Sequence, residues 1–322
     1  MECAQERMIA IDGGGTKTDF VLFGVDGHVF RRVCGDASNP VDLGFDRSCA
    51  VLEAGVAQLL EGAPLHVTAL YAGVSGASIN GYVDFACRRL EALLPSAAVR
   101  VTSDAVIALS SGLPGRNGCV VIAGTGTVVY ARYAQALWRV GGWGYLFDGA
   151  GGGYDLGRAA ITAALRESDG RGPATLLTEL LEARIGMPVC RHLDAFYRGG
   201  KPYIASFAPL VFDAQNRGDQ TAAAILDDTA EAIAESLRTA LRRVDPGDRT
   251  VVLAGGLFHR PEMLLPRLHT RLNGSCRFLL PSFPPVFGAA AEAVITTGRV
   301  VGREFEARFA ATLPPPRQED NK

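Results

Sequence analysis

One layout of residues occurs twice in this chain, and it constrains the fold more than any other feature. Residues 8–11, MIAI, form a short apolar run that leads into the turn DGGGTKT, and an alternating stretch with the hairpin signal Asp26-Gly27 follows. Residues 118–144, GCVVIAGTGTVVYARYAQALWRVGGWG, repeat the order of apolar strand, Gly/Thr turn and two further strands. The repetition lies in the layout and not in residue identity. It predicts an internal duplication of a βββαβα unit, with a boundary near Ser111–Asn117.

The remaining elements follow from hydrophobic periodicity and from turn residues. The first half predicts helices over about 43–60 and 80–94, and strands over 66–72 and 98–102. The second half is mostly helical, and its longest helix, 221–243, is capped by Asp219 and stopped by Asp245-Pro246-Gly247. A strand at 250–256 and a helix at 287–298 complete the second unit. The Pro-rich, charged segment 313–322 is expected to be disordered.

Composition excludes several classes of protein. A length of 322 residues favours two domains or one large one, and 48% hydrophobic and 20% charged residues are typical of a globular protein. The net charge of −2 gives no electrostatic reason to expect nucleic acid or a membrane as a partner, and we expect neither a membrane span nor a signal peptide. The seven cysteines are scattered, odd in number and without a CxxC pair. We therefore expect a cytoplasmic protein without disulfide framework, zinc site or iron–sulfur cluster.

The first turn, Asp12–Thr18, has the residues of a phosphate site. It matches neither GxxxxGK[ST] nor GxGxxG before a helix, because its glycines stand between two strands. Glycines let backbone N–H groups approach a phosphate, and a hydroxyl and a cation add to them. The phosphate-binding candidates are Gly13, Gly14, Gly15, Thr16 and Lys17. Asp12 is a candidate for holding a hydrated Mg²⁺, and the alternative is a glycine-rich hairpin without a ligand.

The second turn, AGTGT at Ala123–Thr127, stands at the equivalent point of the second half. Two small, donor-rich turns at the starts of duplicated halves suggest that both bind one polyphosphate, and the alternative is a tight turn without a ligand. The candidates here are Gly124, Thr125, Gly126 and Thr127. The paired glycines of LAGGLF, Gly255 and Gly256, allow close approach of a flat ligand such as adenine, or else make a compact turn.

Asp104 follows a predicted strand in VRVTSDAVIAL and begins a helix. One interpretation makes it a helix cap, a common role of Ser and Asp at this place. The other places its carboxylate outside the carboxyl end of a strand, where α/β sheets bind ligands. There it could accept the proton of an attacking hydroxyl, as the base of a kinase does.

Taken together and in this order, the motifs resemble those of the sugar kinase/Hsp70/actin superfamily. Within it the chain is similar to the BadF/BadG/BcrA/BcrD-type ATPase family and to its N-acetylglucosamine kinase branch. The resemblance runs from IDGGGTKT to PPVFGAAAEA and includes FAPLVFDAQNRGD at 207–219. It implies an α/β fold of two RNase H-like (actin-like ATPase) domains with an ATP cleft between them. Residues 1–113 would form the sugar and phosphate side and 114–300 the nucleotide side, with 301–312 a helix that packs back on the N-terminal domain.

The resemblance also assigns roles to residues. Both turns would bind the phosphates of ATP, Gly255 and Gly256 the adenosine, and Asp104 would be the catalytic base and a sugar ligand. The sugar-binding positions are Asn39, Trp143, Gly144, Asp148 and Gly153. The implied reaction transfers the γ-phosphoryl group of ATP to the 6-hydroxyl of N-acetylglucosamine or glucosamine, with Mg²⁺. A homodimer is implied as well.

The chain departs from the family after GGWG. Where the branch reads like PLLGDEGSGYWIG, this sequence has YLFDGAGGGYDLG, so the Asp-Glu pair of the family falls on Gly149-Ala150. Loss of that sugar ligand would weaken binding by about 1–3 kcal/mol if nothing replaced it. Asp148, one position earlier, either takes its place or caps the helix that begins near Gly153. A kinase for another hexose, or a low-turnover regulator that binds nucleotide or sugar, are the alternatives.

Overall fold

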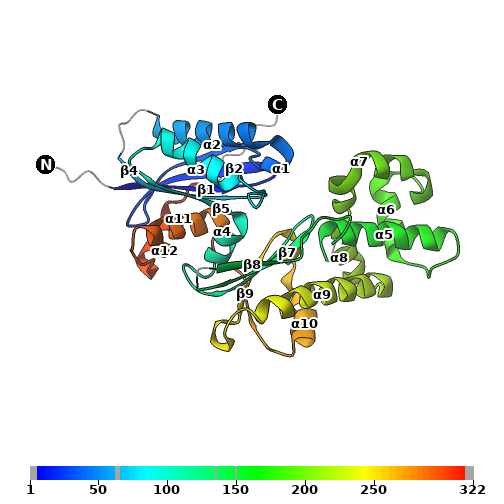
Figure 1. Cartoon of the computed structure of the whole chain (residues 1–322). Helices are drawn as coiled ribbons and strands as arrows, with labels where there is room; N and C mark the ends of the chain where they lie inside the picture. Colours follow the sequence, from blue (N-terminus) through cyan, green and yellow to red (C-terminus); the bar gives the residue numbers. More distant parts are fainter. Residues whose placement is uncertain (1–5, 62–65, 135, 149–150, 316–322) are drawn as a thin grey trace. The chain divides into compact units, whose positions relative to one another are not determined.

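The computed structural model describes residues 6–61, 66–134, 136–148 and 151–315. The chain forms two compact units (Figure 1). The first unit consists of Met1–Arg116 together with Pro281–Lys322, and the second of Asn117–Leu280. The change of unit after Arg116 falls inside the segment Ser111–Asn117, in which the sequence places a boundary.

The first unit is built on a five-stranded mixed sheet. Its strands lie in the order β3-β2-β1-β4-β5, with β1 antiparallel to β2 and parallel to β4. The strands are β1 Arg7–Gly13, β2 Lys17–Gly24, β3 Val29–Asp36, β4 Val67–Val74 and β5 Ala98–Ser103. The helices are α1 Pro40–Leu43, α2 Phe45–Leu60, α3 Tyr82–Leu93, α4 Asp104–Ser110, α11 Pro285–Thr296 and α12 Arg303–Thr312.

Both faces of the first sheet are covered by helices. Ile9 and Ile11 of β1 pack into the core beneath α2 and α3, whereas Met8 and Ala10 pack into the core formed with α11 and α12. Successive side chains of a strand point to opposite faces, so an unbroken apolar run such as MIAI supplies both cores at once. In Figure 1 α2 and α3 lie on one side of this sheet and α11 and α12 on the other.

The second unit repeats the topology of the first. Its sheet has the order β10-β9-β6-β7-β8, which read from the other edge matches the first sheet strand for strand. The strands are β6 Gly118–Ala123, β7 Thr127–Tyr133, β8 Ala136–Val140, β9 Thr250–Ala254 and β10 Arg277–Leu279. The predicted duplication and the α/β class are therefore confirmed.

Most helices of the second unit lie between β8 and β9. They are α5 Gly153–Ser168, α6 Leu176–Ile185, α7 Leu193–Ala205, α8 Ala208–Asn216 and α9 Gln220–Leu241, and α10 Pro261–Leu272 follows β9. Short 3₁₀ helices are η1 Val189–Arg191, η2 Pro246–Asp248 and η3 Gly256–His259. Asp219 caps α9 as predicted, because its Oδ1 accepts a hydrogen bond of 2.7 Å from the Ala222 amide.

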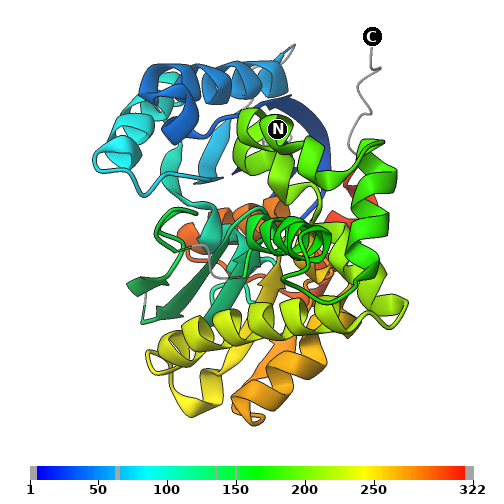
Figure 2. The same ribbon diagram turned by 90° about the vertical axis from the view of Figure 1, so that its right-hand side faces the viewer.

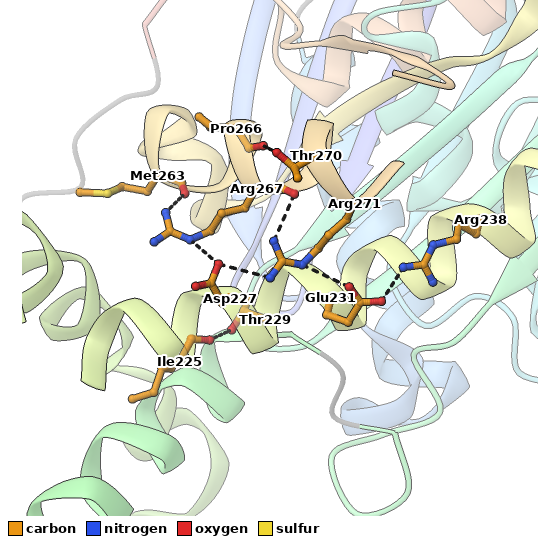
Figure 3. Close-up of polar contacts among 10 residues, drawn as sticks. All are labelled: Ile225, Asp227, Thr229, Glu231, Arg238, Met263, Pro266, Arg267, Thr270 and Arg271. Atoms are coloured by element: carbon orange, nitrogen blue, oxygen red, sulfur yellow. Dashed lines mark hydrogen bonds and ion pairs between the residues drawn. The ribbon is translucent and has the colours of Figure 1, made fainter. Parts of the chain in front are cut away.

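Helices α9 and α10 lie side by side and are joined by ion pairs (Figures 2 and 3). Asp227 on α9 accepts from Arg267 at 3.1 Å and from Arg271 at 3.2 Å, and Arg271 also pairs with Glu231 at 3.2 Å. The two arginines are about four-fifths buried, whereas Asp227 and Glu231 are about half exposed, so solvent still screens these ion pairs.

One predicted boundary differs from the structure. The sequence places residues up to 300 in the second domain, but α11 packs in the core of the first unit. The physical reason is its small apolar surface: a Cβ on Gly288 would lie 1.9 Å from the carbonyl oxygen of Ile107, so α11 lies directly against α4. Helix α12 also packs in the first unit, where Phe305 and Phe309 contact Phe23.

Among the described residues, no helix is long and apolar enough to cross a membrane. Of the segment 313–322 that we expect to be disordered, residues 316–322 lie outside the described part of the chain.

Candidate functional site

The first turn is held rigidly at its base and is exposed at its tip. The Gly14 amide donates to the Lys17 carbonyl at 2.9 Å, and the buried Thr18 hydroxyl donates to the Asp36 carbonyl at 2.7 Å. A Cβ on Gly13 would lie 2.5 Å from the Ser38 hydroxyl oxygen, so only glycine fits at the end of β1. The exposed tip consists of Gly15, Thr16 and Lys17. Of the predicted phosphate-binding residues of this turn, the geometry leaves these three accessible, whereas Gly13 is buried and Gly14 is partly buried.

Asp12 lies beside this turn in an acidic environment. It pairs across the strands with Asp19, which forms a two-point ion pair with Arg32 at 2.8 and 2.5 Å. Burial of the carboxyl group, followed by the negative charges of Asp19 and Asp104, raises the pKa of Asp12 to about 7. A cation bound here would relieve that repulsion. The described residues contain no group of three His, Cys, Asp or Glu side chains that could hold a metal, so Mg²⁺ would need water and phosphate ligands as well.

Asp104 is the first residue of α4 and lies at the same sheet edge as Asp12. Strands β1, β4 and β5 are parallel, and their carboxyl ends therefore meet at one edge. The cap of α4 is Ser103, whose Oγ accepts a hydrogen bond of 3.2 Å from the Ala105 amide and donates one of 3.0 Å to Asp104. The capping role is thus filled by Ser103, and the carboxylate of Asp104 is not needed for it.

Asn39 caps α1 in the first unit. Its Oδ1 accepts a hydrogen bond of 2.9 Å from the Val41 amide, which fixes the side chain. Gly76, with a φ of +79°, lies so close that a Cβ there would be 2.2 Å from Asn39 Oδ1. Since the carbonyl oxygen is used by the cap, the amide nitrogen is the group that Asn39 offers to a ligand.

In the second unit, the second turn is packed against the start of α5. The Gly153 amide donates to the Gly124 carbonyl at 2.8 Å, and the Tyr154 amide donates to the Thr125 carbonyl at 2.9 Å. A Cβ on Gly152 would lie 2.6 Å from the Gly126 Cα, so the glycines before α5 allow this close backbone contact. Gly153, predicted as a sugar ligand, thus has its amide bound to the second turn.

Thr127 begins β7 just after this turn. Its hydroxyl is buried and has no hydrogen-bond partner in the part of the chain that the structure describes. By contrast, the hydroxyl of the corresponding Thr18 in the first unit is hydrogen-bonded, with the Asp36 carbonyl and the Ser38 hydroxyl as its partners. An unsatisfied buried hydroxyl is unfavourable by about 1–3 kcal/mol and fits a site whose ligand supplies the acceptor.

A pocket of about 520 Å³ joins the second turn to the paired glycines after β9. Gly124 and Thr125 line it at one place and Gly256 at another. Gly255 has a φ of +97°, and a Cβ there would lie 2.4 Å from the Ala123 carbonyl oxygen, at the end of β6. The two motifs, about 130 residues apart in sequence, are therefore brought to one site. The other lining residues are Gly153, Pro202, Ala205, Ser206, Ala208, Pro209, Phe212, Leu257, His259 and Arg260.

The apolar wall of this pocket was not assigned from the sequence. Pro209 and Phe212 belong to α8, inside the segment FAPLVFDAQNRGD that carried the family resemblance without a stated role. Pro202 belongs to α7. Apolar and aromatic walls with a few polar groups are typical of small-molecule pockets, and adenine is a ligand of this kind.

The loop Trp143–Asp148 folds back on itself. The Asp148 amide donates to the Gly144 carbonyl at 2.8 Å, and Asp148 Oδ2 accepts from the Trp143 amide at 3.4 Å. Trp143 is 65% exposed, and the Arg139 guanidinium lies 4.5 Å from its ring centroid. The cap of α5 is Gly152, whose amide donates to Asp155 at 3.3 Å. Asp148 therefore does not cap α5, and that alternative is excluded.

The sequence is similar to those of known proteins over most of its length. The sequence profile of the BadF/BadG/BcrA/BcrD ATPase family matches residues 9–293. An N-acetylmuramic acid/N-acetylglucosamine kinase of Clostridium acetobutylicum is 31% identical over 278 residues, which cover 83% of this chain and 90% of the relative. An N-acetyl-D-glucosamine kinase of Dictyostelium discoideum is 27% identical over 316 residues, which cover 89% of this chain and 97% of the relative.

Among solved structures, a candidate N-acetylglucosamine kinase of Chromobacterium violaceum is similar with a TM-score of 0.71 and 27% identity. The match covers 90% of this chain and 99% of that protein. The profile match spans most of the sequence and includes both turns, Asp104 and the paired glycines. This chain belongs to the BadF/BadG/BcrA/BcrD ATPase family.

Proposed function

We propose that this protein is an ATP-dependent sugar kinase that transfers the γ-phosphoryl group to the 6-hydroxyl of N-acetylglucosamine or glucosamine. The observation that carries the proposal is the pocket of the second unit, in which the second turn and the paired glycines meet. Its polar end is a turn rich in N–H and hydroxyl donors, and its other wall is apolar. A nucleotide has this division of charged and flat apolar parts.

The residues fit the parts of phosphoryl transfer. The backbone amides of the two turns bind phosphate oxygens together with Thr16, Lys17 and Thr127, except for the amides of Gly14 and Gly124, which are bonded within their own turns. Gly255 and Gly256 admit the adenosine. Asp104 receives the proton of the attacking hydroxyl, and Asn39 positions the sugar. Asp12 would hold Mg²⁺ mainly through water, and the bound cation would supply positive charge that neutralises the phosphates. Positioning and charge neutralisation provide most of the catalysis in such a site.

The identity of the sugar depends on the loop Trp143–Asp148. The relatives with named substrates act on N-acetylglucosamine, and one also on N-acetylmuramic acid. In this chain the acidic pair after GGWG is replaced, and the Asp148 carboxylate lies against the backbone of its own loop. We propose that Asp148 supplies the sugar contact that the replaced pair would make, and that glucosamine is the alternative acceptor.

The decisive experiment is a coupled assay of ADP release with N-acetylglucosamine, glucosamine, N-acetylmuramic acid and glucose. Sugar-stimulated ADP release that needs Mg²⁺ is expected, and the product should be the 6-phosphate by NMR. A control without sugar measures ATP hydrolysis alone. A folded protein that binds ATP but releases no ADP with any of these sugars would contradict the kinase and favour the low-turnover regulator.

The proposal includes a cytoplasmic homodimer, which rests on the cysteine pattern and the family resemblance. Sedimentation equilibrium at several protein concentrations tests the dimer, and a single species with a mass near 34.0 kDa would contradict it.

A further inference from the structure

Lysine is used in very few places in this chain. Of its 32 basic Lys and Arg residues, the lysines are Lys17, Lys201 and Lys322. Lys17 belongs to the first turn, where it is a predicted phosphate-binding residue, and Lys322 lies outside the described residues. The chain otherwise uses arginine for its positive charges. Among the described residues, Lys201 is therefore the one lysine that has no role assigned so far.

Lys201 lies beside the second turn. Its Nζ atom is 3.7 Å from the position that a Cβ on Gly126 would occupy, so the ammonium group faces the Cα of Gly126 in the turn. The adjacent Pro202 lines the pocket that contains Gly124 and Thr125. The ammonium group is thus next to the turn to which we assign phosphate binding, from an element 75 residues further along the chain.

The backbone before Lys201 is specialised for this placement. Gly200 has a φ of 57° and a ψ of −154°, which breaks α7 into two parts immediately before the lysine. A Cβ on Gly199 would lie 2.6 Å from the Cβ of Tyr203, so the chain can pass there only as glycine. The break lets the second part of α7 begin at Lys201, beside the pocket.

An aromatic pair borders the lysine on its other side. The Tyr145 ring centroid lies 5.6 Å from Lys201 Nζ, and the rings of Tyr145 and Tyr154 are in edge contact at 5.0 Å. The Tyr154 amide in turn donates to the Thr125 carbonyl of the second turn. Contact with the face of a ring is favourable for a cation and leaves the N–H donors of the ammonium available.

The ammonium group of Lys201 has no carboxylate within ion-pair distance among the described residues. By contrast, Arg198 in the same helix pairs with Asp194, and Arg260 at the pocket pairs with Asp213 at 2.7 Å. Lysine presents a compact point charge with three donors, a suitable partner for the spread charge of a polyphosphate. The buried, unsatisfied hydroxyl of Thr127 after the same turn is a separate sign that a ligand with acceptor atoms binds here.

We propose that Lys201 is a phosphate-binding residue: its ammonium group contacts the phosphate oxygens of the nucleotide bound at the second turn, with Tyr145 and Tyr154 positioning it. Lys201 supplies to the second turn the cation that Lys17 supplies to the first. This inference rests on the proposed nucleotide binding of the second unit and does not depend on the identity of the sugar. It also connects Tyr145, a residue of the loop assigned to the sugar, with the nucleotide.

The test is calorimetric binding of ATP, ADP and AMP, without sugar, to the full chain. We compare the wild type with Lys201→Met and Lys201→Arg, and use Arg198→Met as a control that removes one charge from the same helix. Lys201→Met should weaken ATP and ADP binding by about 10- to 150-fold and change AMP binding by less than about threefold. Lys201→Arg should lose less, and Arg198→Met should bind all three nucleotides as the wild type does.

Equal ATP affinity in Lys201→Met and the wild type would overturn the assignment. So would a loss that is the same for ATP and AMP, because a pocket wall and not a phosphate contact would then have been removed. Circular dichroism of each variant shows whether it is folded. A wild type that binds ATP but phosphorylates no sugar would contradict the kinase and leave the role of Lys201 standing, whereas a wild type without ATP affinity would contradict both.

Discussion

Asp104→Asn separates the two roles that an acidic residue can have at the start of a helix. In the structure, Ser103 caps α4 and Asp104 accepts a hydrogen bond from the Ser103 hydroxyl at 3.0 Å. Asparagine has the same shape and an Oδ1 acceptor, so it preserves that bond but cannot receive a proton. We therefore expect Asp104→Asn to lower turnover strongly and to leave the fold intact.

The magnitudes of the two effects differ enough to be told apart. Loss of a general base reduces the rate by about 10²- to 10⁴-fold, which corresponds to about 2.7–5.4 kcal/mol in the barrier. For stability, the first turn of α4 loses the favourable interaction of a negative charge with the helix dipole, about 0.3–1 kcal/mol. Removing the repulsion between Asp104 and Asp12 offsets part of this loss. The free energy of unfolding should thus change by less than about 1 kcal/mol.

Ser103→Ala is the matched control for the same helix end. It removes the cap, in which Ser103 Oγ accepts from the Ala105 amide, and should lower the free energy of unfolding by about 0.5–2 kcal/mol. Its turnover should stay within about tenfold of the wild type, because the carboxylate remains. The assays are urea unfolding, calorimetric ATP binding and coupled ADP release. Equal turnover of Asp104→Asn and Ser103→Ala, with both variants folded, would refute the role of Asp104 as the base.

Three further predictions concern other parts of the site. Thr127→Val should raise the free energy of unfolding by about 1 kcal/mol, since it removes a buried hydroxyl without a partner. Thr18→Val should lower the free energy of unfolding, because that hydroxyl is hydrogen-bonded. Urea unfolding that ranks the two variants in the opposite order would contradict this prediction. Gly255→Ala should be destabilised by about 1–3 kcal/mol and bind ATP more weakly, because its φ is +97° and its Cβ would meet the end of β6. Gly256→Ala, whose Cβ would meet nothing within 4 Å, is the control for stability in urea unfolding, and equal stability of the two variants would contradict the prediction. Asp148→Ala should raise the KM for the sugar by about 5- to 150-fold with the KM for ATP unchanged, and an unaltered KM for the sugar would limit Asp148 to holding its own loop.

Local patterns in the sequence were sufficient to predict the framework of both units. The run MIAI has no polar face, and β1 is accordingly buried on both sides between two layers of helices. The turns DGGGTKT and AGTGT each join two antiparallel strands, as their position between apolar runs predicts. The place of Asp219 before a periodic helix predicts a cap, and the structure confirms it. These features depend on neighbours in sequence, which a single chain displays directly.

Features that depend on distant packing could not be predicted in this way. The helix α11 is apolar and rich in small residues, which indicates burial but not the unit in which it is buried. In the same way, nothing around Lys201 in the sequence indicates Gly126, because that approach depends on the break of α7 at Gly200. Phe212 looks like an ordinary core residue of α8, and only the fold places it in the wall of the pocket that contains the second turn.

The path of the chain through the two units has a consequence for biosynthesis. The second unit is one continuous segment, Asn117–Leu280, but the first is completed only when Pro281 and later residues are added. Because a ribosome releases the chain from its N-terminus, the second unit can finish folding while the first still lacks α11 and the apolar face of its sheet, with Met8 and Ala10, stays uncovered. A nascent chain arrested before α11 should therefore bind chaperones through its earliest strands. These strands leave the ribosome first, but their apolar face is covered only when α11 has been added.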